Sequence, residues 1–140
     1  KTKTKVGGQR KEEAMTLYEE CQMIQEYTDV QCSDNPEEVI ERIQTLSSYL
    51  SRTAFIKKEA NKLLNIQKSK EIQETIIKIA TESHLSASVQ NALLKSICIY
   101  ETELVDWSDR LNATCTHQID SCRSILSWLK EDLRLAKTGY

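Results

Sequence analysis

The stretch 32-CSDNPEEVIERI-43 carries the strongest helix-start signal in the sequence. Asp34 or Asn35 suits the N-cap position, and Pro36 suits the first helical position. The two glutamates that follow place negative charge beside the positive end of the helix dipole. The chain has one proline and three glycines, and no glycine lies between residues 9 and 138, so few residues can break a helix that starts here.

Apolar residues continue at helical spacing from this start to about residue 81. They are Val39, Ile43, Leu46, Leu50, Ala54, Ala60, Leu64, Ile72, Ile76 and Ile79. The pattern predicts one helix over about 36–81, roughly 65 Å long at 1.5 Å per residue. A similar pattern predicts a helix over about 87–136, capped by Ser86 or Ser88, and a shorter helix over about 10–31.

Two long helices joined by a short connector are expected to fold back on each other as an antiparallel hairpin. With the bend near residue 83, Arg52 should lie near Cys115 and Lys62 near Val105. We therefore predict an all-α, coiled-coil-like fold: a long helical hairpin plus a shorter N-terminal helix. The whole chain, 1–140, is read as one helical domain with a flexible basic arm at 1–9.

Apolar side chains occur on more than one face of the predicted helices, as at the neighbouring Ile76 and Ile77. A hairpin of two helices cannot cover both faces, so the first helix is expected to cover one portion and another copy of the chain the rest. We therefore expect the chain to form a homo-oligomer, with itself as its first partner.

The composition favours a soluble cytoplasmic protein. No apolar run approaches the length of about 20 residues that a membrane span needs, and the basic start is not followed by a signal-peptide core, so no membrane association is expected. The five cysteines form an odd set without a C-x-x-C pair, which is typical of reduced thiols rather than of a disulfide framework. No cofactor is expected.

Cys115, His117 and Cys122 lie close together in the sequence, but helical geometry separates them. Because each residue turns a helix by about 100°, the two cysteines share a face and the histidine points to the opposite side. One helix cannot bring these three side chains to one metal ion. The segment lies in mid-helix, where no free amides form an oxyanion hole, so neither a metal site nor an enzyme is expected.

Charge is unevenly distributed along the chain. Residues 12–41 carry ten acidic groups and no basic group, whereas residues 42–80 carry eight basic groups and three acidic groups. Candidate nucleic-acid-binding residues on the second helix are Arg52, Lys57, Lys58 and Lys62, here called the basic strip. The strip is either an ordinary solvated face or a surface that binds phosphates without sequence preference.

A polar line on the third helix offers a second candidate site. It consists of Arg110, His117, Asp120 and Arg123. These residues either form a solvated face with local ion pairs or line an inter-subunit contact or anionic-ligand pocket.

Two resemblances are carried by particular stretches. "YLSRTAFIKKEANKLL" (49–64) and the segment 100–136 resemble small all-helical proteins of Bacteroidetes phages and prophages. The basic "SRTAFIKKEANKLL" helix followed by a Trp-containing long helix is similar in layout to the recombination mediator of T-even bacteriophages. The second resemblance implies a ring-shaped oligomer that binds single-stranded DNA, with Lys57, Lys58 and Lys62 as its DNA contacts.

These observations together predict a non-enzymatic phage-type accessory protein in the host cytoplasm. The expected activity is binding of single-stranded DNA or of a recombination or replication protein by a self-associating hairpin. One alternative is an anti-defence inhibitor or nucleotide-signal sponge that uses the polar line and Arg52. Another alternative is a helical assembly scaffold.

Overall fold

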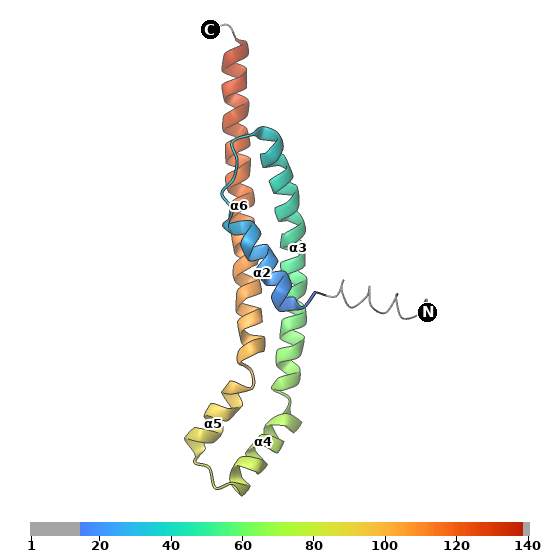
Figure 1. Cartoon of the computed structure of the whole chain (residues 1–140), viewed down its shortest axis with the longest axis vertical. Helices are drawn as coiled ribbons and strands as arrows, with labels where there is room; N and C mark the ends of the chain where they lie inside the picture. Colours follow the sequence, from blue (N-terminus) through green and yellow to red (C-terminus); the bar gives the residue numbers. More distant parts are fainter. Residues whose placement is uncertain (1–14, 139–140) are drawn as a thin grey trace, which may run out of the picture.

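The computed structural model describes residues 15–138, and this part of the chain is all-helical (Figure 1). Its five helices are α2 (Leu17–Asp29), α3 (Pro36–Gln67), α4 (Lys70–Glu82), α5 (Ala87–Ser96) and α6 (Ile99–Lys137), and these residues contain no strand. The predicted all-α class is confirmed. The predicted basic arm, 1–9, and the predicted start of the first helix at residue 10 lie outside the described residues.

The helix start at residue 36 follows the predicted chemistry. The side chain of Asn35 accepts a hydrogen bond from the backbone N–H of Glu37 at 2.9 Å, and Pro36 occupies the first turn. Within the described residues the first helix begins at Leu17, because the Thr16 hydroxyl caps it by accepting from the Glu19 N–H. Both caps satisfy amides that would otherwise lack a partner.

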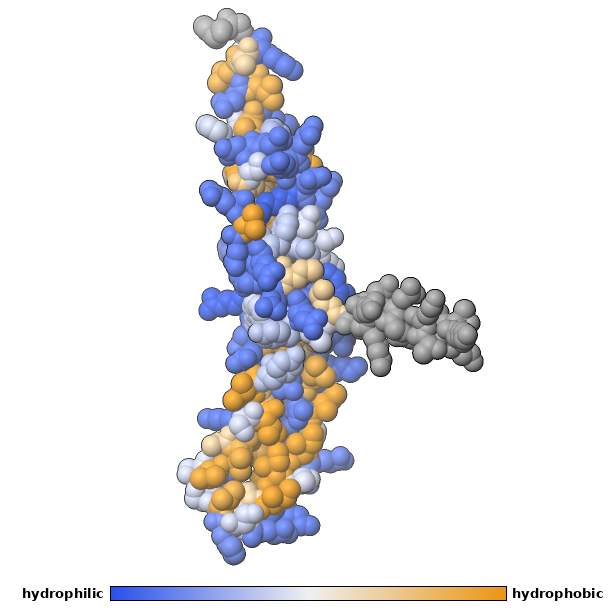
Figure 2. All heavy atoms as spheres, viewed as in Figure 1, coloured by the Kyte–Doolittle hydropathy of each residue, from blue (hydrophilic) through white to orange (hydrophobic). Residues whose placement is uncertain are grey.

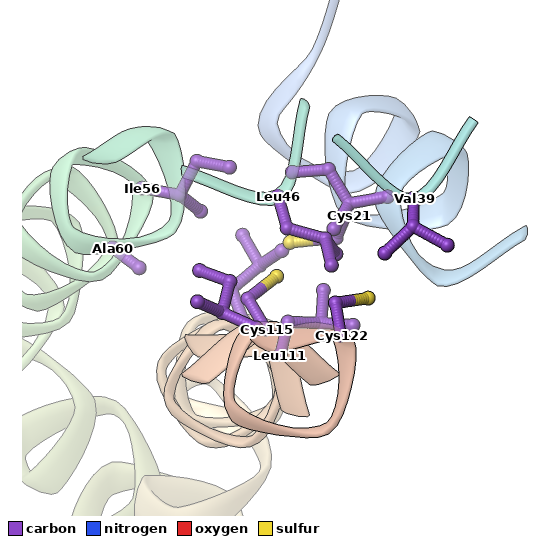
Figure 3. Close-up of a cluster of buried hydrophobic side chains, with 11 residues drawn as sticks. Cys21, Val39, Leu46, Ile56, Ala60, Leu111, Cys115 and Cys122 are labelled. Atoms are coloured by element: carbon purple, nitrogen blue, oxygen red, sulfur yellow. The ribbon is translucent and has the colours of Figure 1, made fainter. Parts of the chain in front are cut away.

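Helices α3 and α6 run side by side in opposite directions and form most of the tertiary contacts (Figure 1). Figure 3 shows Leu46, Ile56 and Ala60 of α3 facing Leu111 and Cys115 of α6, all of them within 2% of complete burial. Their removal from water is the main stabilising contribution. The observed pairing of α3 with α6 is close to the expected one. Lys57 pairs with Asp109, and these residues lie five positions before Lys62 and four positions after Val105, which were expected to face each other.

Helix α2 packs against α3 and α6 of its own chain and completes the core. Cys21 and Ile24 of α2 are fully buried. At the edge, the ring of Tyr18 meets Trp107 edge-on at 5.2 Å, and the Trp107 indole N–H donates to Gln25 Oε1 at 3.0 Å. The first helix therefore turns a two-helix pair into a three-helix core over its own length.

The predicted continuous helix over 36–81 is wrong, because α3 ends at Gln67 and α4 begins at Lys70. The eight steps from Leu64 to Ile72 turn an α-helix about 80° past two full turns. In an unbroken helix Ile72 would therefore point well away from the core face that includes Ala60. The break at residues 68 and 69 changes the direction in which the apolar face of α4 points.

The predicted continuous helix over 87–136 is also wrong, because α5 ends at Ser96 and α6 begins at Ile99. This second break lies beside the first: Lys68 and Cys98 line the same hollow of about 440 Å³. Both long rods thus bend at one level, and α4 and α5 pack on each other beyond it. His84, in the left-handed region at φ 60°, ends α4 where many helices use glycine.

Candidate functional site

Arg52 of the basic strip is engaged within the chain. Its guanidinium donates two hydrogen bonds to the Glu20 carboxylate of α2, at 2.5 and 2.8 Å, and lies 4.6 Å from the centre of the Phe55 ring. The hydrogen bonds to Glu20 raise the pKa of Arg52 above its ordinary value. Arg52 therefore helps to hold α2 on α3, and its donors are directed toward a carboxylate rather than solvent.

Lys57 points to the other flank of α3, where its ammonium lies 2.8 Å from Asp109 of α6. Lys58 and Lys62 are exposed and form no ion pair with any residue between 15 and 138. Together with Lys57 and Asn61, they line a shallow hollow on α3. Three members of the basic strip, Lys57, Lys58 and Lys62, thus lie around one hollow. Arg52 is not part of that hollow and is held by α2, and Lys57 is in addition paired with α6.

The polar line lies on the outer side of α6. Arg110, His117, Asp120 and Arg123 are all exposed. Asp120 and Arg123 form a local ion pair at 3.7 Å across one turn. The structure therefore places these four residues along the exposed side of one helix.

The cysteines of α6 point into the core, as helical geometry requires. Cys115 and Cys122 are buried, and burial raises the pKa of both thiols, that of Cys122 to about 11. His117 is exposed on the other side of the helix. Across residues 15–138 no group of three or more His, Cys, Asp or Glu side chains is arranged to hold a metal ion.

A polar cluster that the sequence did not reveal joins the α2–α3 loop to α6. Arg42 is 8% exposed, and its Nη2 donates to the Val30 carbonyl at 2.7 Å and to Gln118 Oε1 at 2.9 Å. Gln118 in turn donates to the Thr28 carbonyl at 2.8 Å. None of the ion pairs among the described residues includes Arg42. Its buried charge is instead held by amide oxygens and by the ring of Tyr27, 5.0 Å away.

Cys32 lies in the same loop, and its Sγ is 3.7 Å from Cys122 Sγ. The two residues are 90 positions apart in the sequence. Neither residue lies in a cysteine motif, so no spacing rule could have paired them. Only the path of the α2–α3 loop over α6 brings the two thiols together.

An exposed apolar area lies at the closing end of the structure, defined here as residues 70–96. Exposed apolar side chains of this end and its edges are Ile66, Ile77, Ile79, Leu85, Val89, Leu93, Ile99 and Tyr100. Figure 2 shows hydrophobic residues gathered over the end formed by α4 and α5. An apolar surface of this kind is typical of a contact with another macromolecule.

A second apolar area lies at the opposite end, on residues 127–137 of α6, here called the C-terminal segment. This segment extends past the start of α3 (Figure 1). Its exposed apolar residues include Trp128 at 67%, Leu133 at 55% and Leu135 at 49%. This segment is the end of the helix predicted over 87–136, and in the structure all of its residues from 130 to 137 are exposed.

No protein-family model, curated protein or solved structure matches this chain. Between residues 15 and 138, no helix has the combined length and apolar character of a membrane span.

Proposed function

We propose that the protein is a non-enzymatic assembly element whose helical rods pair with a second copy of the same chain. In this pair the rods lie antiparallel, so that the closing end of each copy covers the C-terminal segment of the other. The observation that carries the proposal is the presence, at each end of a single rod, of an apolar area that the residues between 15 and 138 leave exposed. In a two-fold antiparallel pair, the contact between a closing end and a C-terminal segment occurs twice, so the apolar areas of both copies are covered.

The closing end has too little internal packing to explain its folded state. Across α4 and α5 only Ala80 is buried, although these helices contain 13 and 10 residues. Isolated helices of this length are marginal in water, and most helix stability in proteins comes from burial of an apolar face. A covering surface supplies the burial that is missing in one copy.

Charge favours the antiparallel direction over the parallel one. Residues 17–41 of α2, the loop and the start of α3 contain acidic groups and no basic group. Two parallel copies would bring these acidic segments together, and like charges repel. The antiparallel pair instead places each acidic segment nearer to α3 and α4 of the other copy, where Lys58, Lys62 and Lys78 are exposed.

Sedimentation velocity over a range of concentrations tests this proposal. We expect the full chain to form a dimer that dissociates on dilution, because the two apolar areas are buried only in the pair. Ile79→Glu at the closing end and Leu133→Glu in the C-terminal segment should each raise the dimer Kd at least tenfold, about 1.4 kcal/mol. A monomer at all concentrations would contradict the proposal.

Thr116→Glu provides the matched control. Thr116 is exposed near the middle of α6, away from both apolar areas, so the same new charge should leave the dimer Kd unchanged. If all three variants weaken association equally, net charge rather than apolar contact controls it, and the assigned surfaces are wrong.

A second candidate function, binding of single-stranded DNA, rests on Lys58 and Lys62 and on the resemblance in layout to the phage recombination mediator. These two lysines are exposed on one side of α3 and free of ion pairs with the described residues. Phosphate contacts by lysine release counterions, so binding should weaken steeply as salt increases.

Fluorescence anisotropy with a labelled single-stranded oligonucleotide checks this second function. Lys58→Glu with Lys62→Glu should abolish salt-sensitive binding, whereas Lys130→Glu with Lys137→Glu on α6 should have little effect. Equal affinity of both double variants would mean that α3 is not the DNA-binding surface.

A further inference from the structure

We infer that Cys32 and Cys122 form an oxidation site: a thiol pair that a peroxide converts to a disulfide between the α2–α3 loop and α6. The two sulfur atoms lie 3.7 Å apart. A disulfide bond is about 2.05 Å long, so its formation needs an approach of less than 2 Å. This inference does not depend on the proposed self-association, because both thiols belong to one chain.

The surrounding hydrogen bonds hold the loop in place over α6. Arg42 donates to the Val30 carbonyl of the loop and to Gln118 of α6, and Gln118 donates to the Thr28 carbonyl. Through these three bonds, Arg42 of α3 links the loop to Gln118 of α6, and Gln118 holds the end of α2 at Thr28. These residues line the same hollow as the two cysteines. The position of the thiol pair is therefore set by hydrogen bonds at Val30, near Cys32, and at Gln118, near Cys122.

The two thiols differ in access. Cys122 is 1% exposed, whereas Cys32 is half-buried in the loop. A hollow of about 230 Å³ is lined by Cys32, Cys122 and Arg42. One water occupies about 30 Å³ in the liquid, so the hollow admits a molecule the size of hydrogen peroxide. Cys32 is therefore the thiol that peroxide reaches first.

The reaction balances with hydrogen peroxide as the only oxidant. The Cys32 thiolate attacks one peroxide oxygen, the O–O bond breaks, and hydroxide leaves to become water, so that Cys32 carries a sulfenic acid. The Cys122 sulfur then attacks the Cys32 sulfur as its thiol proton is lost. The S–O bond breaks, a second water leaves, and the disulfide forms. Two thiols are oxidised, and one peroxide is reduced to two waters.

The other cysteines provide internal controls. Cys21 and Cys115 are fully buried, and Cys98 is 8% exposed. Among the described residues, no other pair of sulfur atoms is in hydrogen-bonding contact. One equivalent of peroxide should therefore oxidise two thiols of the five and leave three free.

Peptide mapping of the full chain identifies the bond directly. After treatment with hydrogen peroxide and alkylation, combined digestion with trypsin and an Asp-specific protease releases residues 29–33 (DVQCS) and 120–123 (DSCR), each with one cysteine. We expect these two peptides to be linked, and the link to disappear with dithiothreitol. Linkage through any other cysteine, free thiols throughout, or a Cys32 sulfinic acid without linkage would each overturn the inference.

Thermal unfolding gives a second readout. The disulfide would close a loop of about 90 residues, so oxidation should raise Tm by on the order of 5 °C or more. Cys32→Ser should lose this rise, and Cys98→Ser should retain it. A rise that persists in Cys32→Ser would assign the oxidation to other residues. Because Cys32 is only half-buried, its serine variant should fold, and the mapping of the unaltered chain does not depend on it.

Discussion

The central core and the closing end use similar apolar residues with opposite results. In the central core, α2 and the facing parts of α3 and α6 bury Ile24, Leu46 and Leu111 to within 2% of completion. At the closing end, Ile79 of α4 is 58% exposed and Leu93 of α5 is 39% exposed. The difference lies in the number of helices, because three helices surround the core and only two form the closing end.

This contrast shows that amphipathic sequence alone does not produce a closed core. Helix α2 supplies the third side of the central core, and it ends at Asp29 after 13 residues. Beyond its reach, the apolar faces of α4, α5 and the C-terminal segment are left exposed by the described residues, as is typical of a contact surface. The predictions that follow separate regions that are complete in one copy from regions that are not.

The largest expected effect comes from a matched pair of leucine substitutions. Leu46→Ala removes a fully buried side chain from the central core and should lower the free energy of unfolding by about 3 kcal/mol. Leu93→Ala, at 39% exposure, should lower it by less than about 1 kcal/mol in dilute protein. Urea unfolding at low micromolar concentration measures both. Equal losses would mean that the closing end has a core of its own.

The next effect concerns alkaline pH. Burial, and secondarily the charge of Glu20, raises the pKa of the Cys21 thiol from 9.0 to about 11. Below pH 9 the thiol is neutral in the folded and unfolded states, and its stabilising burial is fully retained. As pH rises from 9 toward 11, only the unfolded thiol loses its proton, so stability falls. Tm should therefore decrease over this range.

Cys21→Ala should make this decrease in Tm less steep, because it removes the thiol whose pKa is raised. Ile24→Val is the control, since it weakens the same buried surface and leaves the thiol in place. The comparison uses slopes of Tm against pH rather than absolute values, because both variants also lose packing. Parallel slopes for all three proteins would show that the buried thiol does not govern alkaline stability.

The smallest expected effect is the difference in coupling energy between an ion pair that joins two helices and an ion pair within one helix. Arg52 and Glu20 join α3 to α2 through a two-point contact with side chains 47% and 13% exposed. A double-mutant cycle with Arg52→Gln and Glu20→Gln should give a coupling energy of about 0.5–1 kcal/mol. The same cycle for Lys70 and Glu74, 89% and 65% exposed within α4, should give only a few tenths. The reverse order would contradict the role assigned to Arg52.

Local chemistry predicted the parts of the fold that depend on neighbouring residues. Asn35 and Pro36 set the start of α3, and Ser86 caps α5 as expected, with its hydroxyl accepting from the Val89 N–H. The break after Gln67 was missed, although its signal is present in the eight-residue step from Leu64 to Ile72. When the apolar positions are only listed in order, the change in helical phase between Leu64 and Ile72 is not apparent.

The contacts of the candidate site could not be read from the sequence, because they join distant positions. Arg52 was identified as a basic surface residue, but its partner Glu20 lies 32 positions earlier. Cys32 meets Cys122 through the path of one loop, which no helical periodicity describes. The basic strip was drawn by sequence spacing, and the structure keeps Lys57, Lys58 and Lys62 around one hollow but turns Arg52 toward Glu20 of α2.

Hydrogen exchange measured at several protein concentrations tests whether the closing end and the C-terminal segment are covered only when two copies associate. We predict that amides of α4, α5 and the C-terminal segment are protected at high concentration and lose protection on dilution, while those around Leu46 and Leu111 stay protected throughout. Protection of the closing end that does not change with concentration would contradict the account, because it would show that one copy of the chain completes this end alone.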